Sequence, residues 1–142
     1  MTEELEQLLK SLGLDRVAEI YDEQLKLANT QSLTHTDLLL RLLRPQWHAR
    51  QEKALAWRIR RALLPEQCTL ASFPYAKQPG VSRRQIRSFA ELDFIPRAEN
   101  IVFIGKTGVG KTGLASGLLL KALQNGYRGQ FIRAQDLFDE MY

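Results

Sequence analysis

Apolar residues recur at spacings of three and four through the first part of the chain, with acidic residues on the other face, which is the pattern of amphipathic helices. The first such stretch, residues 3–28, contains Gly13, so we predict either one helix or two helices with a break near this glycine. A second apolar stripe begins at Leu38 and meets Pro45. Either Pro45 kinks this helix, or a new helix begins there and continues to Leu64.

The pattern changes in the second half of the chain. Residues 68–81 contain two prolines and a glycine and predict an extended connector, and residues 82–92 predict another helix. The β-branched and aromatic run at 101–104 is typical of a buried parallel strand. Helical spacing returns over 112–125, and residues 129–134 favour a second strand. Strand, helix and strand in this order predict one βαβ unit.

These elements predict an α/β fold in which a helical N-terminal domain precedes the first βαβ unit of a P-loop parallel sheet. We place the helical, partly basic domain at residues 1–67, a connector with a lead-in helix at 68–98, and the start of an ATP-binding domain at 99–142. The sheet is expected to be incomplete at the C-terminus, because only a short helix at 137–142 follows the second strand.

The strongest chemical signal lies between the first predicted strand and the helix after it. Gly105-Lys106-Thr107-Gly108-Val109-Gly110-Lys111-Thr112 fits the spacing glycine, four residues, glycine, lysine and serine or threonine. Glycines let the backbone curl so that several N–H groups converge on a triphosphate. Lys111 then places its charge on the terminal phosphates, and the hydroxyl of Thr112 is expected to ligate the Mg²⁺ that accompanies ATP. The strand, loop and helix order is the context that this motif requires.

Groups for hydrolysis are not identifiable in the same way, and we name no catalytic residue. Hydrolysis needs an acidic residue at the end of a neighbouring strand and a further group that orients water. Leu137-Phe138-Asp139-Glu140 resembles an acidic strand end, but Gln135 and Asp136 interrupt any apolar strand before it, and a helix start at Asp136 fits better. The chain is therefore expected to bind a nucleotide. The sequence does not decide whether it hydrolyses ATP.

Composition limits the remaining possibilities. One cysteine, Cys68, excludes an internal disulfide and a zinc site built from several cysteines. No apolar run approaches the ~20 residues of a membrane helix. The first residues, Met1 to Glu4, are acidic where a secretory signal is basic, so we expect a cytoplasmic protein without a membrane partner.

Positive charge is concentrated in the middle of the chain. The net charge is +4, yet residues 1–31 have seven acids and three bases whereas residues 32–90 have three acids and eleven bases. A helix-rich stretch with so few acids can bind along a phosphate backbone. A charged helical face exposed to solvent explains the excess of bases about equally well. Trp47 and Trp57 lie within this stretch, and their helical spacing favours a place in a core. The candidate DNA-binding residues are Arg41, Arg44, Arg50, Lys53, Arg58, Arg60 and Arg61.

The whole chain resembles the N-terminal part of the IstB family, the ATP-binding helper proteins of bacterial insertion sequences, which are related to the DnaC-type helicase loaders of the AAA+ group. The likeness is distributed over the leucine-rich start, Ser32 to Leu43, Arg50, Arg58 to Pro65, Phe73, Phe94-Ile95, Asn100, the loop with Leu114-Ala115, Asn125-Gly126-Tyr127, Phe131 and Ala134 to Leu137. Three features depart from the family pattern. Gly113 stands where histidine is usual, Lys106-Thr107 replaces a proline-rich pair, and Pro45-Gln46 replaces acids.

This resemblance implies an ATP-dependent, DNA-binding protein that acts with a transposase in DNA transposition and forms a homo-oligomer at full length. It implies ATP and Mg²⁺ as cofactors and carries the phosphate-binding role to Gly105 through Thr112, position by position. The magnesium-water and arginine-finger roles of the family match no residue of this sequence, which is expected of an N-terminal fragment. Two alternatives stay open: a DnaC-like loader of a replicative helicase, and a non-hydrolysing DNA-binding remnant.

Overall fold

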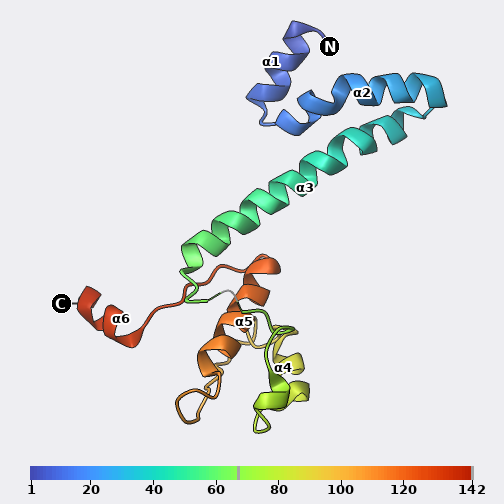
Figure 1. The fold of residues 1–142 in the computed structure, drawn as a ribbon. Helices are drawn as coiled ribbons and strands as arrows, with labels where there is room; N and C mark the ends of the chain where they lie inside the picture. The colour runs from blue at the N-terminus through green and yellow to red at the C-terminus, as the bar shows by residue number, and fades with distance from the viewer. Residues whose placement is uncertain (67, 142) are drawn as a thin grey trace. The chain divides into compact units, whose positions relative to one another are not determined.

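The computed structural model describes residues 1–66 and 68–141, and within them the chain is helical (Figure 1). The elements in order are α1 (Glu3–Ser11), α2 (Asp15–Gln31), α3 (His35–Ala62), the single 3₁₀ turn η1 (Tyr75–Lys77), α4 (Arg83–Phe89), α5 (Lys111–Gln124) and α6 (Ala134–Met141). The chain is divided into two compact units, Met1–Ala54 and Leu55–Tyr142. The boundary between them lies inside α3.

The first unit begins with two helices, α1 and α2, that are joined by a turn at Gly13. This glycine has a φ of +67°, which is in the left-handed region that favours glycine, and it separates α1 from α2. The predicted break near Gly13 is therefore confirmed, and it produces two helices. Leu9, Val17 and Leu42 are buried together and form the apolar core of this unit.

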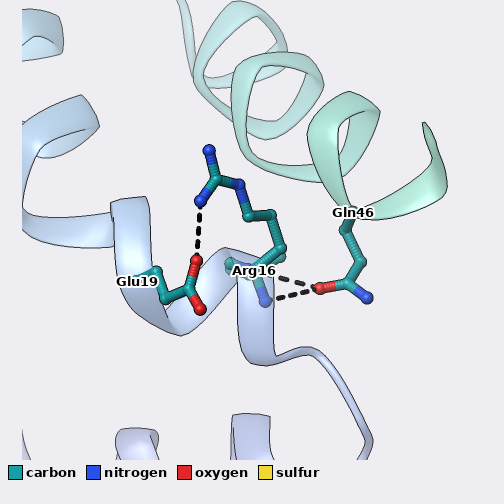
Figure 2. Close-up of polar contacts among 4 residues, drawn as sticks. Arg16, Glu19 and Gln46 are labelled. Carbon is teal, nitrogen blue, oxygen red and sulfur yellow. Dashed lines mark hydrogen bonds and ion pairs between the residues drawn. The ribbon is translucent and has the colours of Figure 1, made fainter. Parts of the chain in front are cut away.

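The N-terminus of α2 is capped by a side chain from another helix. The residue before α2, Leu14, has no side chain that can accept a hydrogen bond. Figure 2 shows that Gln46 of α3 takes this role: its Oε1 accepts from the backbone N–H of Arg16 at 2.9 Å and of Val17 at 3.4 Å. The Nε2 of Gln46 also donates to the carbonyl of Gly13 at 3.2 Å. One amide therefore satisfies backbone groups on both sides of the turn.

Helix α3 continues through Pro45, so no new helix begins at that proline. The expectation that the tryptophans lie in a core was wrong, because Trp47 is 58% exposed and Trp57 is 42% exposed. Helix geometry gives the reason. Trp47 follows the buried Leu42 by five residues, and Trp57 precedes the buried Ala62 by five. Five residues turn a helix by about 140° beyond one full revolution, which points each ring away from the buried face.

The second unit is organised around α5. Phe73 from the connector, Ile86 from α4 and Leu114 from α5 are buried together. Helix α4 begins after Ser82, whose side chain accepts a hydrogen bond from the N–H of Gln85, as is common at helix starts. The sequence therefore predicted α4 and α5 correctly, and it placed the start of α5 within one residue of the observed Lys111.

The predicted βαβ unit is wrong: within residues 1–66 and 68–141 the structure contains no strand (Figure 1). Residues 101–104 and 129–133 are irregular. Val102 and Ile104 are 76% and 92% exposed, so the apolar run is not buried in a sheet. The N–H of Phe131 donates to the carbonyl of Ala62 at 2.7 Å, at the end of α3, and not to a neighbouring strand. Because a strand is stabilised by the hydrogen bonds of its partner, an apolar pattern without a partner does not form one.

The last predicted helix is present, and it begins earlier than expected, at Ala134 instead of Leu137. Its predicted last residue, Tyr142, lies outside the described residues. In the part of the chain that the structure describes, no helix combines the length and the apolar composition that crossing a membrane requires.

Candidate nucleotide-binding site

The glycine-rich loop, residues 105–112, leads directly into α5, which begins at Lys111. Its curvature depends on two glycines in the left-handed region, Gly108 with a φ of +85° and Gly110 with a φ of +88°. Side chains rarely adopt these values, so the loop uses the conformational freedom of glycine at both positions. Gly110 is also the residue that caps the N-terminus of α5.

Gly110 is packed against the ring of Phe73 from the connector. A Cβ built on Gly110 would lie 2.7 Å from Cε2 and 2.8 Å from Cζ of Phe73, which is too close for any side chain. Phe73 is 5% exposed and makes an edge contact with Tyr75, the two ring centroids being 4.9 Å apart. The aromatic ring therefore fills the space where a side chain at Gly110 would be. It supports the loop from the connector side.

A second connector residue contacts the loop by a polar interaction. The Nε2 of Gln78 donates to the carbonyl of Gly108 at 3.4 Å. Phe73 and Gln78 thus contact two glycines of the loop from one segment of the connector. Sequence patterns gave no signal for either contact, because the residues lie about thirty positions or more before the loop.

Lys111 folds back over the start of the loop. Its Nζ donates to the carbonyl of Gly105 and to the carbonyl of Lys106, both at 2.6 Å. These two bonds fix the ammonium group on the loop and turn both carbonyl oxygens toward it. The side chain thus places one positive charge within the curve that the glycines make.

Several backbone donors of the loop have no acceptor among the residues that the structure describes. Among residues 1–66 and 68–141, no hydrogen bond uses the N–H groups of residues 106–112. The first N–H groups of α5 add to them, since the start of a helix has no partners within the helix and has a partial positive charge. Donors, helix N-terminus and lysine together suit an anion with several oxygens, so these residues fit the phosphates of a nucleotide. The exposed Thr112 stands at the second position of α5.

A cavity of about 480 Å³ adjoins the loop within the same unit. Val109 of the loop and Lys111 and Leu114 of α5 line it, together with residues of α4 and of the segments 80–82 and 93–104. Besides Lys111, the charged residues of the lining are Asp93, Arg97 and Glu99.

A model of the IstB-like ATP binding protein family matches residues 7–142. The chain belongs to this family. It is 33% identical over 141 residues to a protein of Geobacillus stearothermophilus named as an ATP-binding protein of insertion sequence IS5376, covering 99% of this chain and 56% of the relative.

A second relative, from Pseudomonas aeruginosa, is named as an ATP-binding protein of insertion sequence IS21. It is 35% identical over 129 residues, which cover 91% of this chain and 49% of the relative. The chain thus spans about half the length of these two relatives.

Gly113, where the sequence departs from the family pattern, has space for a Cβ atom. A Cβ on Gly113 would lie 3.5 Å from Oε1 of Glu66, 3.7 Å from Sγ of Cys68 and 3.9 Å from the ring of Phe73. These are ordinary contact distances. Gly113 has no positive φ, so nothing in its backbone demands glycine. Gly110 differs from it on both counts.

The basic candidates are divided between the two units. Arg41, Arg44, Arg50 and Lys53 belong to the first unit, and Arg58, Arg60 and Arg61 belong to the second. Within the described residues the ion pairs are those of the Met1 amino group with Asp22, of Lys10 with Glu6 and of Arg16 with Glu19. None of these ion pairs involves a basic residue of α3.

Proposed function

We propose that the glycine-rich loop binds the phosphates of ATP, with Thr112 as a ligand of the accompanying Mg²⁺. The observation that carries this proposal is the glycine-built curve with unpaired N–H donors at the start of α5 and the Lys111 ammonium group across it. The family and the names of both relatives support ATP as the nucleotide. Bound Mg²⁺ would neutralise phosphate charge, and the hydroxyl of Thr112 would be the protein's oxygen ligand to it.

We further propose that the protein assists DNA transposition of an insertion sequence, together with a transposase. Membership of the family and the insertion-sequence names of the relatives support this role. Double-stranded DNA is the proposed second partner, and the excess of bases over acids in residues 32–90 supports it. A homo-oligomer belongs to the same proposal. Co-purification with the transposase encoded by the same insertion sequence is the test of that partnership.

The decisive experiment compares ATP binding by the wild type and by Lys111→Ala, using a fluorescent ATP analogue at equilibrium. Loss of a charged hydrogen-bonding group should weaken affinity by about tenfold or more. Lys121→Ala is the matched control, since it removes the same charge from an exposed position of α5 outside the loop. The control should stay within about twofold of the wild type. Equal affinity of the wild type and Lys111→Ala would refute ATP binding by this loop.

The role of Thr112 is tested by the same titration with and without Mg²⁺. In the wild type, Mg²⁺ should strengthen ATP binding. Thr112→Ala should lose this benefit, and Thr112→Ser, which restores a hydroxyl, should recover it. If Thr112→Ala responds to Mg²⁺ as the wild type does, Thr112 is not the ligand.

A further inference from the structure

Two arginines from distant parts of the sequence meet on one tryptophan in the second unit. The guanidinium carbon of Arg61, near the end of α3, lies 4.8 Å from the ring centroid of Trp57. The guanidinium carbon of Arg128, in the segment after α5, lies 5.9 Å from the same centroid. We call Trp57, Arg61 and Arg128 the arginine–tryptophan cluster. Its members line a shallow hollow together with Arg58, Gly129 and Gln130.

Arg58, the third arginine at this hollow, has a structural role. It is half-buried, and its Nε donates to the carbonyl of Leu123 at 2.9 Å. This bond ties α3 to the last turn of α5, where carbonyl groups have no partner within the helix. The other two arginines are exposed. The cluster is thereby positioned by Arg58, while Arg61 and Arg128 remain accessible to a ligand.

The cluster has an excess of positive charge. No ion pair of the described residues involves Arg61 or Arg128, and the hollow has no acidic residue in its lining. Two cations on one ring repel each other, and the negative face of the tryptophan offsets only part of that repulsion. An anion between the guanidinium groups would neutralise both. The paired N–H donors of guanidinium match the oxygens of a phosphate group.

We infer that the arginine–tryptophan cluster binds phosphate groups of the backbone of double-stranded DNA. This inference rests on the proposed DNA binding and gives it a site within one unit. The ring of Trp57 holds the guanidinium groups in place, and Arg61 and Arg128 contact phosphate oxygens. Backbone contacts of this kind are independent of base sequence.

The test is a titration of labelled duplex DNA of mixed sequence with the full chain, followed by fluorescence anisotropy between about 50 and about 200 mM salt. Arg61→Ala and Arg128→Ala should each weaken binding about three- to tenfold, and each should lower the slope of log K against log salt by about one. Arg133→Ala is the matched control, being an exposed arginine outside the cluster. It should leave affinity within about twofold of the wild type.

Two further variants separate charge from packing. Arg61→Lys keeps the charge, so its salt slope should equal that of the wild type although its affinity falls. Trp57→Ala should weaken binding as much as loss of one arginine, and Trp57→Phe, which retains an aromatic face, should restore most of the affinity. Thermal unfolding of each variant identifies any loss that comes from misfolding.

If Arg61→Ala and Arg128→Ala bind duplex DNA as Arg133→Ala does, the site inference is wrong while DNA binding by the chain stands. If the wild type fails to bind duplex DNA, or binds only single strands, both the site and the proposed duplex partner are wrong. ATP binding, measured on the same proteins, is independent of either outcome. The failures of the two proposals are therefore distinguishable.

Discussion

At the scale of single residues, the conformation of the glycine-rich loop depends most on Gly110. Its φ of +88° and the 2.7 Å distance from a Cβ at this position to the Phe73 ring make a side chain unfavourable for two separate reasons. Gly113, three residues later, is free of both constraints. The sequence identified the glycines of the loop from their spacing, because their role is local. It could not identify Phe73 as the neighbour.

Gly110→Ala should destabilise the chain by about 2 kcal/mol through backbone strain and displacement of Phe73, and it should weaken ATP binding. Chemical denaturation measures the first effect and the fluorescent titration the second. Gly80→Ala is the control, since Gly80 has open space around it and no positive φ, and it should change stability by less than about 0.5 kcal/mol. Similar stabilities of the two variants would contradict the role assigned to Gly110.

Ser116 in α5 has an unusual position for a polar residue. It is fully buried, and among the described residues its Oγ has no hydrogen-bond partner. A buried hydroxyl without a partner has lost its water without replacement, which costs about 1–3 kcal/mol.

Ser116→Ala is therefore expected to stabilise the chain by about 1 kcal/mol or more, measured by chemical denaturation. Alanine also favours helices, and Ser88→Ala on the exposed side of α4 measures that contribution alone, about 0.5 kcal/mol. The difference between the stability gains of Ser116→Ala and Ser88→Ala measures the cost of the buried hydroxyl. A destabilised Ser116→Ala would mean that this hydroxyl has a partner in solution.

At the scale of elements, the helices follow from local patterns, and so do the caps of α1 and α4, which Thr2 and Ser82 provide. Apolar spacing and Gly13 predicted α1 and α2 with the break between them. The cap of α2, in contrast, comes from Gln46 of α3, thirty residues after Arg16. The same limit applies to Trp47 and Trp57: their spacing is helical, but which face of α3 is buried depends on the residues packed against it.

Gln46→Ala should destabilise the first unit by about 1 kcal/mol, because the N–H groups of Arg16 and Val17 lose their acceptor. Gln46→Glu keeps an acceptor and adds a negative charge at a helix N-terminus, but it loses the donor to the carbonyl of Gly13, so it should recover only part of the lost stability. The measurement is urea denaturation followed by circular dichroism. Gln51→Ala, at an exposed position of α3, is the control. Equal effects of Gln46→Ala and Gln51→Ala would refute the cap.

At the scale of the whole molecule, the chain forms two compact units and no sheet within the described residues. The predicted βαβ unit failed because each strand needs hydrogen bonds from a partner that its own sequence does not specify. Residues 101–104 have the apolar composition of a strand, yet Val102 and Ile104 remain largely exposed. The basic candidates all lie on α3 and are likewise divided between the two units, four in the first and three in the second.

The sequence by itself predicted the helical segments, the position near Gly13 where a break occurs and the glycine-rich loop before α5, because side-chain spacing and glycine conformations act over a few residues. It left open whether a new helix begins at Pro45. Only the tertiary structure decided what each of these contacts. It placed Phe73 against Gly110, Gln46 on the start of α2, and Arg128 beside Arg61 on Trp57. It also left the apolar run before the loop without a strand partner. These contacts join residues far apart in the chain, and their energies depend on packing that local pattern does not encode.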